Sequence, residues 1–184
     1  MTMTLTRKRS PALPASPAES AAPSLEALFK SHWENLCRAV YRLVGDRPEA
    51  EDLVLEAFVQ LHQRPPDRAD NLAGWLYRVA INLGLNTLRA RKRRLRYEEQ
   101  AGALWLEQPL GDPASELESA QEQERVRVTL SDMKPAAAQA LILRHSGFTY
   151  AEIAAALGIS STSVGTLLAR AEKEFEQKYR QRRG

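Results

Sequence analysis

Hydrophobic residues recur at intervals of three and four along most of the chain, which is the spacing of helices with one buried face. The first stripe covers residues 24–44 and ends at Gly45. Its apolar members are Leu25, Leu28, Phe29, Trp33, Leu36, Cys37, Val40 and Tyr41. Because nearly every apolar window has helical rather than alternating spacing, the pattern predicts an all-α fold.

A second helix is predicted to begin after Asp46. Asp46 and Glu49 have the spacing of a capping box, and Pro48 suits the first turn of a helix. The expected buried side consists of Ala50, Leu53, Val54, Ala57, Phe58 and Leu61. The pair Pro65-Pro66 is expected to end this helix.

A third helix is expected to be capped by Asp70 or Asn71, after a polar loop. Its expected buried residues are Trp75, Leu76, Val79, Ala80 and Leu83. Trp75 and Tyr77 are interpreted either as core residues or as a platform on which an unpaired base could stack.

The third helix continues into the run RARKRRLR at residues 89–96, where charge replaces the apolar stripe. Its basic residues are Arg89, Arg91, Lys92, Arg93, Arg94 and Arg96. Such a run predicts phosphate contacts whose strength depends steeply on salt concentration. A solvated helix end or an import signal is the alternative interpretation of the same run.

The region after residue 134 has the pattern of a helix-turn-helix. Pro135 is predicted to open a helix ending near His145, Gly147 suits a left-handed turn, and Thr149 with Glu152 forms a second capping box. The inward residues of the motif are Ile153, Ala154, Leu157, Ile159, Val164 and Leu167 or Leu168, with Gly158 at its turn. The simpler alternative is an ordinary helical hairpin within a bundle.

Such a motif would present a nearly uncharged helix to a DNA groove. The outward residues are Ser161, Thr162, Ser163, Gly165, Thr166, Ala169 and Arg170. Hydroxyl groups can bind base edges or phosphates but exert little electrostatic attraction, so this helix alone should bind DNA weakly.

The charges divide the chain into blocks. Residues 24–97 carry a net charge of +4 and residues 125–184 a net charge of +5, whereas residues 98–124 carry −8. We therefore expect two small helical domains, at 24–97 and 118–184, joined by an acidic flexible linker at 98–117 and preceded by a disordered tail at 1–23.

The sequence gives little support to an enzyme. The three histidines, His32, His62 and His145, are spread over separate helices, and the lone cysteine, Cys37, lies on an apolar face that fits a reducing cytoplasm. No phosphate-binding glycine loop or nucleophile motif is present, so we expect neither catalysis nor a metal or other cofactor.

Three stretches together resemble the extracytoplasmic-function (ECF) group of bacterial sigma factors, in the sigma-70 family. They are DRPEAEDLVLEAFVQLH, LAGWLYRVAINLGLNTLRARKRR and ALILRHSGFTYAEIAAALGISSTSVGTLLARAEKEF. The resemblance covers about 24–97 and 118–180, with both parts in the order typical of that group.

The resemblance implies that the first domain docks on the clamp of the largest polymerase subunit and opens the minus-ten element of a promoter. The residues at the matching clamp-binding positions are Glu51, Asp52, Leu53 and Glu56. The loop 68–71 and the following helix would hold a flipped base and the separated strand, and the second domain would bind the minus-thirty-five element. An inhibitory anti-sigma protein is a further implied partner.

Some positions depart from the family pattern. Gly165, Leu167 and Ala169 stand where members often have Lys, Arg and His, and Leu55 stands where Gln is common. A weakly basic recognition helix can nevertheless suffice if polymerase and the basic third helix share the binding. The alternative function is a stand-alone helix-turn-helix regulator that binds paired half-sites as a dimer.

Overall fold

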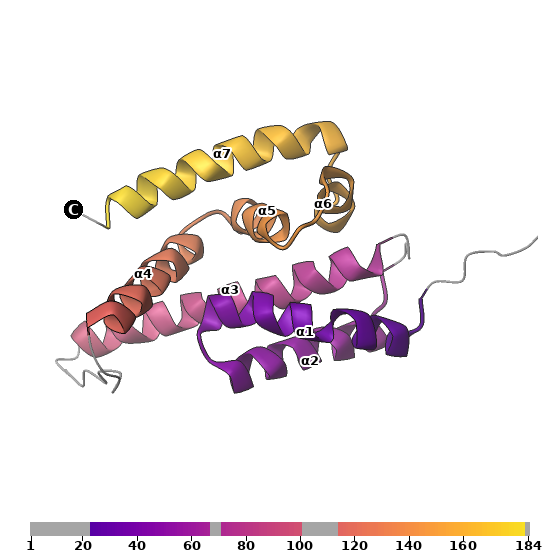
Figure 1. The fold of residues 1–184 in the computed structure, drawn as a ribbon, viewed down its shortest axis with the longest axis horizontal. Coiled ribbons are helices and arrows are strands. Elements are labelled where there is room, and N and C mark those ends of the chain that lie inside the picture. The colour runs from indigo at the N-terminus through magenta and orange to yellow at the C-terminus, as the bar shows by residue number, and fades with distance from the viewer. Residues whose placement is uncertain (1–22, 67–70, 101–113, 183–184) are drawn as a thin grey trace, which may run out of the picture.

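The computed structural model describes residues 23–66, 71–100 and 114–182. These residues form seven α-helices and contain no strand, which confirms the predicted all-α fold (Figure 1). The helices are α1 (Leu25–Val44), α2 (Arg47–Gln63), α3 (Leu72–Gln100), α4 (Ala114–Ser131), α5 (Pro135–His145), α6 (Tyr150–Leu157) and α7 (Ser161–Arg180).

The caps of the first three helices come from local sequence. The Ser24 side chain accepts a hydrogen bond from the backbone of Ala27, and Gly45 ends α1 with a φ of 78°. Asp46 accepts a hydrogen bond from the Glu49 backbone at 2.8 Å, while the Glu49 carboxylate pairs with Arg91 of α3. At the start of α3, the Asn71 side chain accepts a hydrogen bond from the Gly74 backbone at 2.8 Å.

Helix α3 is the central element of the fold. It contacts α1 and α2 on one side and α4, α5 and α6 on the other, as Figure 1 shows. Leu76 and Ala80 are buried as predicted, but Trp75, Val79 and Leu83 are only partly buried. The other fully packed residues of this helix are Tyr77, Ile81, Leu85 and Leu88.

The C-terminal helices contain the expected helix-turn-helix. The capping box between Thr149 and Glu152 is complete, and its hydrogen bonds lower the pKa of the Glu152 carboxyl. Gly158 takes the left-handed conformation that the turn requires, with a φ of 68°, and α6 and α7 meet at 91°. Ile153, Val164 and Leu168 are buried beneath the turn.

The two helical parts pack against each other through one continuous hydrophobic cluster that includes residues from all of the helices. Helix α3 extends to Gln100 and α4 begins at Ala114, so both ends of the expected linker 98–117 are helical. The centre of that linker, like the tail 1–22 and the loop 67–70, lies outside the described residues.

Candidate functional site

The outward face of α7 is open to solvent along its first turns. Ser161, Thr162, Ser163, Thr166 and Arg170 are all exposed, and Gly165 is partly covered. The Ser160 hydroxyl lies 3.0 Å from the Thr162 hydroxyl and 2.6 Å from that of Ser163, so these groups already share hydrogen bonds. The face can enter a groove, but its only charge is that of Arg170.

The basic run of α3 divides into engaged and exposed residues. Arg89 donates from Nε to the Ser131 carbonyl at 3.1 Å, and Lys92 pairs with the carboxylate of Asp132. Arg91 pairs with Glu49 and donates to the Val44 carbonyl at 2.7 Å. The remaining residues, Arg93, Arg94 and Arg96, are exposed.

The beginning of α3 borders a cavity of about 450 Å³ that also reaches α6. It is lined on the α3 side by Asn71, Trp75 and Arg78, together with Pro66. Tyr77 is only 4% exposed and packs edge-on against Phe148, with ring centroids 4.7 Å apart. Of the two aromatic candidates, Tyr77 is therefore a core residue, whereas Trp75 faces the cavity.

The predicted clamp-binding residues lie on α2 in different environments. Asp52 and Glu56 are exposed, and Glu56 accepts a hydrogen bond from Gln60 at 3.0 Å. Glu51 is partly buried and accepts a hydrogen bond from Arg47 at 2.8 Å. Leu53 packs against the hydrophobic core, so it is less accessible than its acidic neighbours.

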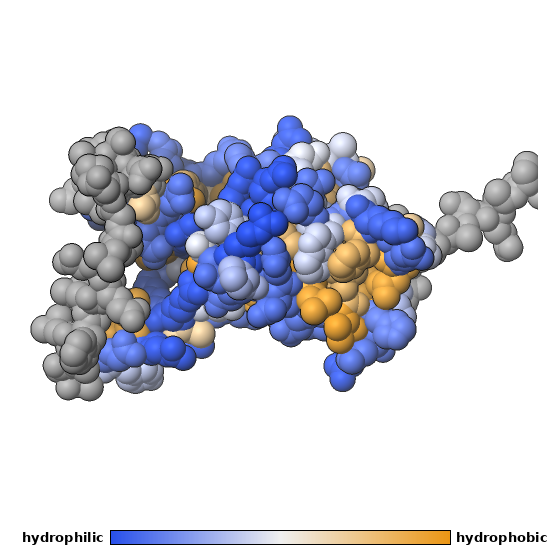
Figure 2. All heavy atoms as spheres, turned by 60° about the horizontal axis from the view of Figure 1, so that its bottom comes forward, coloured by the Kyte–Doolittle hydropathy of each residue, from blue (hydrophilic) through white to orange (hydrophobic). Residues whose placement is uncertain are grey.

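Two apolar residues complete the exposed face of α2. Leu55 is 50% exposed and Val59 is 44% exposed, and their spacing from Asp52 and Glu56 places all four on one side of the helix. Figure 2 shows hydrophobic side chains gathered on the surface formed by α1 and α2. The predicted clamp-binding set, Glu51, Asp52, Leu53 and Glu56, did not include Val59, although its helical spacing from Asp52 and Glu56 places it on the same face.

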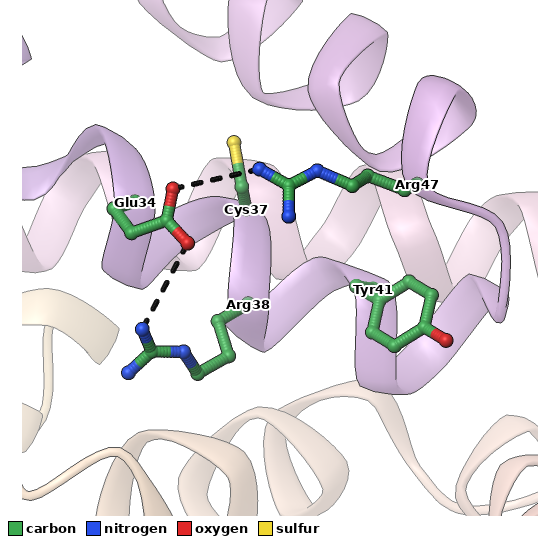
Figure 3. Close-up of a pocket in the computed structure, with 5 residues that line it drawn as sticks. All are labelled: Glu34, Cys37, Arg38, Tyr41 and Arg47. Atoms are coloured by element: carbon green, nitrogen blue, oxygen red, sulfur yellow. Dashed lines mark ion pairs between the residues drawn. The ribbon is translucent and has the colours of Figure 1, made fainter.

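A separate pocket of about 320 Å³ lies between α1 and α2, lined by Glu34, Cys37, Arg38, Tyr41 and Arg47 (Figure 3). The Glu34 carboxylate lies 3.7 Å from Arg47 and 3.8 Å from Arg38. Burial, with smaller contributions from Glu51 and Glu34, raises the pKa of the Cys37 thiol to about 11. A thiolate is therefore disfavoured, and this cysteine is poorly suited to act as a nucleophile.

The described parts of the chain contain no group of three or more His, Cys, Asp or Glu side chains placed to hold a metal ion. In the same ranges, no single helix has the length and apolar character of a membrane span; the bent pair α6–α7 meets that test of length and composition only when its helices are taken together.

The two parts of the chain match two regions of one protein family. Residues 28–94 match Sigma-70 region 2, and residues 123–175 match Sigma-70, region 4. The first region contains α2 and the basic run of α3 as far as Arg94, and the second contains α6 and most of α7.

Curated relatives of this chain are ECF RNA polymerase sigma factors. The ECF RNA polymerase sigma factor SigE of Mycolicibacterium smegmatis is 29% identical over 86% of this chain. The ECF RNA polymerase sigma factor SigL of Mycobacterium tuberculosis is 30% identical over 82% of this chain and 86% of its own length. The chain belongs to the ECF sigma factors of the sigma-70 family.

Relatives differ in length. The chain spans 62% of SigE and only 48% of SigJ of Mycobacterium tuberculosis, which is 32% identical over 154 residues. Among solved structures, that of CnrH in complex with the cytosolic domain of CnrY has a TM-score of 0.53 at 20% identity and covers 83% of this chain and 85% of CnrH. This likeness supports the fold.

Proposed function

We propose that this chain is an initiation subunit that binds core RNA polymerase in the cytoplasm and directs it to particular promoters. The observation that carries the proposal is the presence of region 2 and region 4 in order in one chain, with a recognition helix whose outward face has a single charge. Because such a helix binds DNA weakly alone, it needs a second site on the same assembly.

Two surfaces receive separate roles in this proposal. The exposed face of α2 contacts the polymerase, where Asp52 and Glu56 meet basic groups and Leu55 and Val59 bury apolar area. The outward face of α7 and the basic run of α3 contact DNA. Glu51 and Leu53, which are less exposed, support the polymerase surface from its edge.

The chain acts by binding and strand separation, without making or breaking covalent bonds. Unstacking a promoter base costs a few kcal/mol, which contacts to the extruded base and to the strand must offset. Trp75 and Arg78 line the cavity at the start of α3, and their aromatic and cationic side chains suit such contacts. By family likeness, an anti-sigma protein is a further expected partner.

The direct test is transcription in vitro. Core RNA polymerase is supplied with genomic fragments from the source bacterium, with and without the purified chain, and the start sites are mapped. The proposal predicts new start sites, preceded by a shared pair of sequence elements, only when the chain is present. Identical start sites in both reactions would contradict it.

The alternative function, a stand-alone helix-turn-helix regulator, predicts different behaviour in solution. A regulator of this kind would bind paired half-sites as a dimer and would not copurify with polymerase. The measured mass of the chain and its copurification with core polymerase separate the two functions. The match of residues 28–94 to region 2 favours the sigma factor.

A further inference from the structure

A groove with an apolar part and a polar part lies between α1 and the C-terminal helices. Its apolar part is a cavity of about 350 Å³ bordered by α1, α4, α5 and α7. The apolar side chains that line it include Leu43, Val126, Leu130, Ile142 and Phe175. Small-molecule sites are usually cavities of about 300–1,000 Å³ lined mainly by apolar side chains, so this part of the groove has the size and lining of a ligand site.

The polar part of the groove is a second cavity, of about 220 Å³, that adjoins the first. The two cavities share four lining residues, which are Ala39, Arg42, His145 and Ser146. The polar part adds Asn35, Arg38 and Tyr77. Among the described residues that line either cavity none is acidic, whereas Arg38 and Arg42 are cationic. The polar part therefore favours an anionic group.

The guanidinium group of Arg42 is available to such an anion. Arg42 is exposed, and within the described ranges its side chain forms neither an ion pair nor a hydrogen bond. Arg38, by contrast, already lies 3.8 Å from the Glu34 carboxylate. Arg42 is therefore the better candidate of the two to bind a negatively charged ligand.

The hydroxyl of Tyr77 is a second available donor. The Tyr77 side chain is only 4% exposed, and a buried tyrosine hydroxyl usually has a hydrogen-bond partner, but this one has none among the residues that the structure describes. The same residues include no fully buried side-chain oxygen without a partner, so the Tyr77 oxygen keeps contact with the open groove. Burial, opposed in part by the charge of Arg38, raises the pKa of Tyr77 to about 12. The hydroxyl thus keeps its proton at neutral pH and can donate it to an anion.

This arrangement matches a ligand with a carboxylate head and an apolar body. A guanidinium group binds a carboxylate through two parallel hydrogen bonds, and the Tyr77 hydroxyl can donate to a carboxylate oxygen in the same polar part. The adjoining apolar part can remove a hydrocarbon chain from water, and each buried methylene group strengthens binding roughly 4-fold. An amphiphile with a cationic head would instead be repelled by the two arginines.

We propose that this groove binds a small amphipathic carboxylate, such as a medium-chain fatty acid, with its head at Arg42 and Tyr77 and its chain among the apolar side chains of α4, α5 and α7. The inference goes beyond the proposed function and does not depend on it, since binding is measured on the chain alone. Helices of both matched regions border the groove, so the bound ligand would contact both and stabilise the folded chain.

The first measurement is calorimetric titration of the full chain with decanoate, below the concentration at which decanoate forms micelles. We expect saturable binding at one site, with a dissociation constant on the order of 100 μM. Octanoate and hexanoate should bind progressively more weakly, by roughly 4-fold for each methylene group removed.

Two amphiphiles with the same hydrocarbon chain test the role of the head group. Decanol, which is neutral, and decyltrimethylammonium, which is cationic, should each bind at least about 10-fold more weakly than decanoate. Equal binding of the cationic amphiphile would mean that the chain takes up any apolar molecule, and it would overturn the inference.

Variants of the polar part locate the head of the ligand. Arg42→Gln removes the charge, and Tyr77→Phe removes only the hydroxyl while keeping the ring that packs against Phe148. Each should weaken decanoate binding roughly 10-fold. Lys30→Gln is the matched control, because it removes the same charge from an exposed side chain of α1 that pairs with Glu26 outside the groove. Equal weakening in Lys30→Gln would indicate a simple effect of net charge and contradict the assignment.

Val126→Phe tests the apolar part by filling it with a larger side chain, with circular dichroism to check that helical content is kept. It should weaken decanoate binding at least about 10-fold, whereas Val59→Phe, which adds the same bulk to exposed α2, should not.

Amide chemical shifts of the parent protein provide a test that needs no variant. Decanoate should shift the amide signals of Ala39, Ile142 and Phe175, which line the apolar part from three helices. Shifts confined to other residues, or no saturable binding of decanoate at all, would overturn the inference even if a helical peptide of a partner protein occupied the groove.

Discussion

Gly158 shows how a single backbone conformation sets the geometry of the C-terminal part. Its φ of 68° lies in the left-handed region, and a Cβ at this position would meet no atom within 4 Å. The glycine is therefore required for conformational rather than for steric reasons. Because the turn orients α7 at 91° to α6, its stability bears on how the recognition helix is presented.

We predict that Gly158→Ala lowers the free energy of unfolding by about 1 kcal/mol, since a left-handed conformation is unfavourable for alanine. Denaturant unfolding, followed by circular dichroism, measures the change.

Gly165→Ala is the matched control within the same motif. Gly165 lies inside α7, and a Cβ there would be at an ordinary distance of 3.7 Å from the Tyr150 ring. Alanine is the better helix former, so this variant should gain roughly 0.5–1 kcal/mol. A loss of stability in Gly165→Ala, or none in Gly158→Ala, would contradict this account of the two glycines.

At the scale of the elements, sequence predicts what is set locally. Sequence alone predicts the helix caps and the turn of the helix-turn-helix, because each capping residue bonds to a partner only a few positions away. These residues are Asp46, Asn71 and Thr149 at the caps and Gly158 at the turn. The predicted helices and the helix-turn-helix are confirmed for the same reason. A spacing of three or four residues is enough to specify them.

Local spacing in the sequence does not predict which residues of α3 are buried, nor which groups its charged side chains pair with. A single apolar stripe predicts one packed side, but α3 packs on two, which explains why Ile81, Leu85 and Leu88 were not expected in the core. Lys92 and Asp132 are 40 residues apart, and charge alone does not identify a partner at that separation. The roles of the predicted site residues remain predictions.

The exposed face of α2 leads to a prediction about the polymerase. We expect the double variant Leu55→Ala, Val59→Ala to bind core polymerase roughly 10-fold more weakly, because buried apolar side chains at the centre of an interface usually contribute most to affinity. Titration of labelled chain with core polymerase, followed by fluorescence anisotropy, gives the dissociation constants.

Two controls define that surface. Tyr41→Ala, which removes a comparably exposed side chain from α1, should leave polymerase binding unchanged.

Replacing Arg93, Arg94 and Arg96 with alanine should leave polymerase binding unchanged. The same replacement should reduce the slope of log affinity for promoter DNA against log salt concentration by roughly 0.7–0.9 per lost phosphate contact. If Leu55 and Val59 can be replaced without weakening the complex, the polymerase does not bind this face.

At the scale of the whole molecule, two small helical parts share one core and one long helix. Arg89 and Lys92 of α3 are engaged by the turn between α4 and α5, and the outward face of α7 has a single charge, so we expect the chain alone to bind DNA weakly. Held apart on polymerase, the same two surfaces would act together, and the second contact would benefit from a high effective concentration.

The most direct test of this account compares three mixtures on one promoter fragment identified by start-site mapping: the chain alone, core polymerase alone, and both together. We predict a heparin-resistant, sequence-specific complex only in the third mixture. Tight and sequence-specific retention of the fragment by the chain alone, at an affinity similar to that of the complete mixture, would contradict the account.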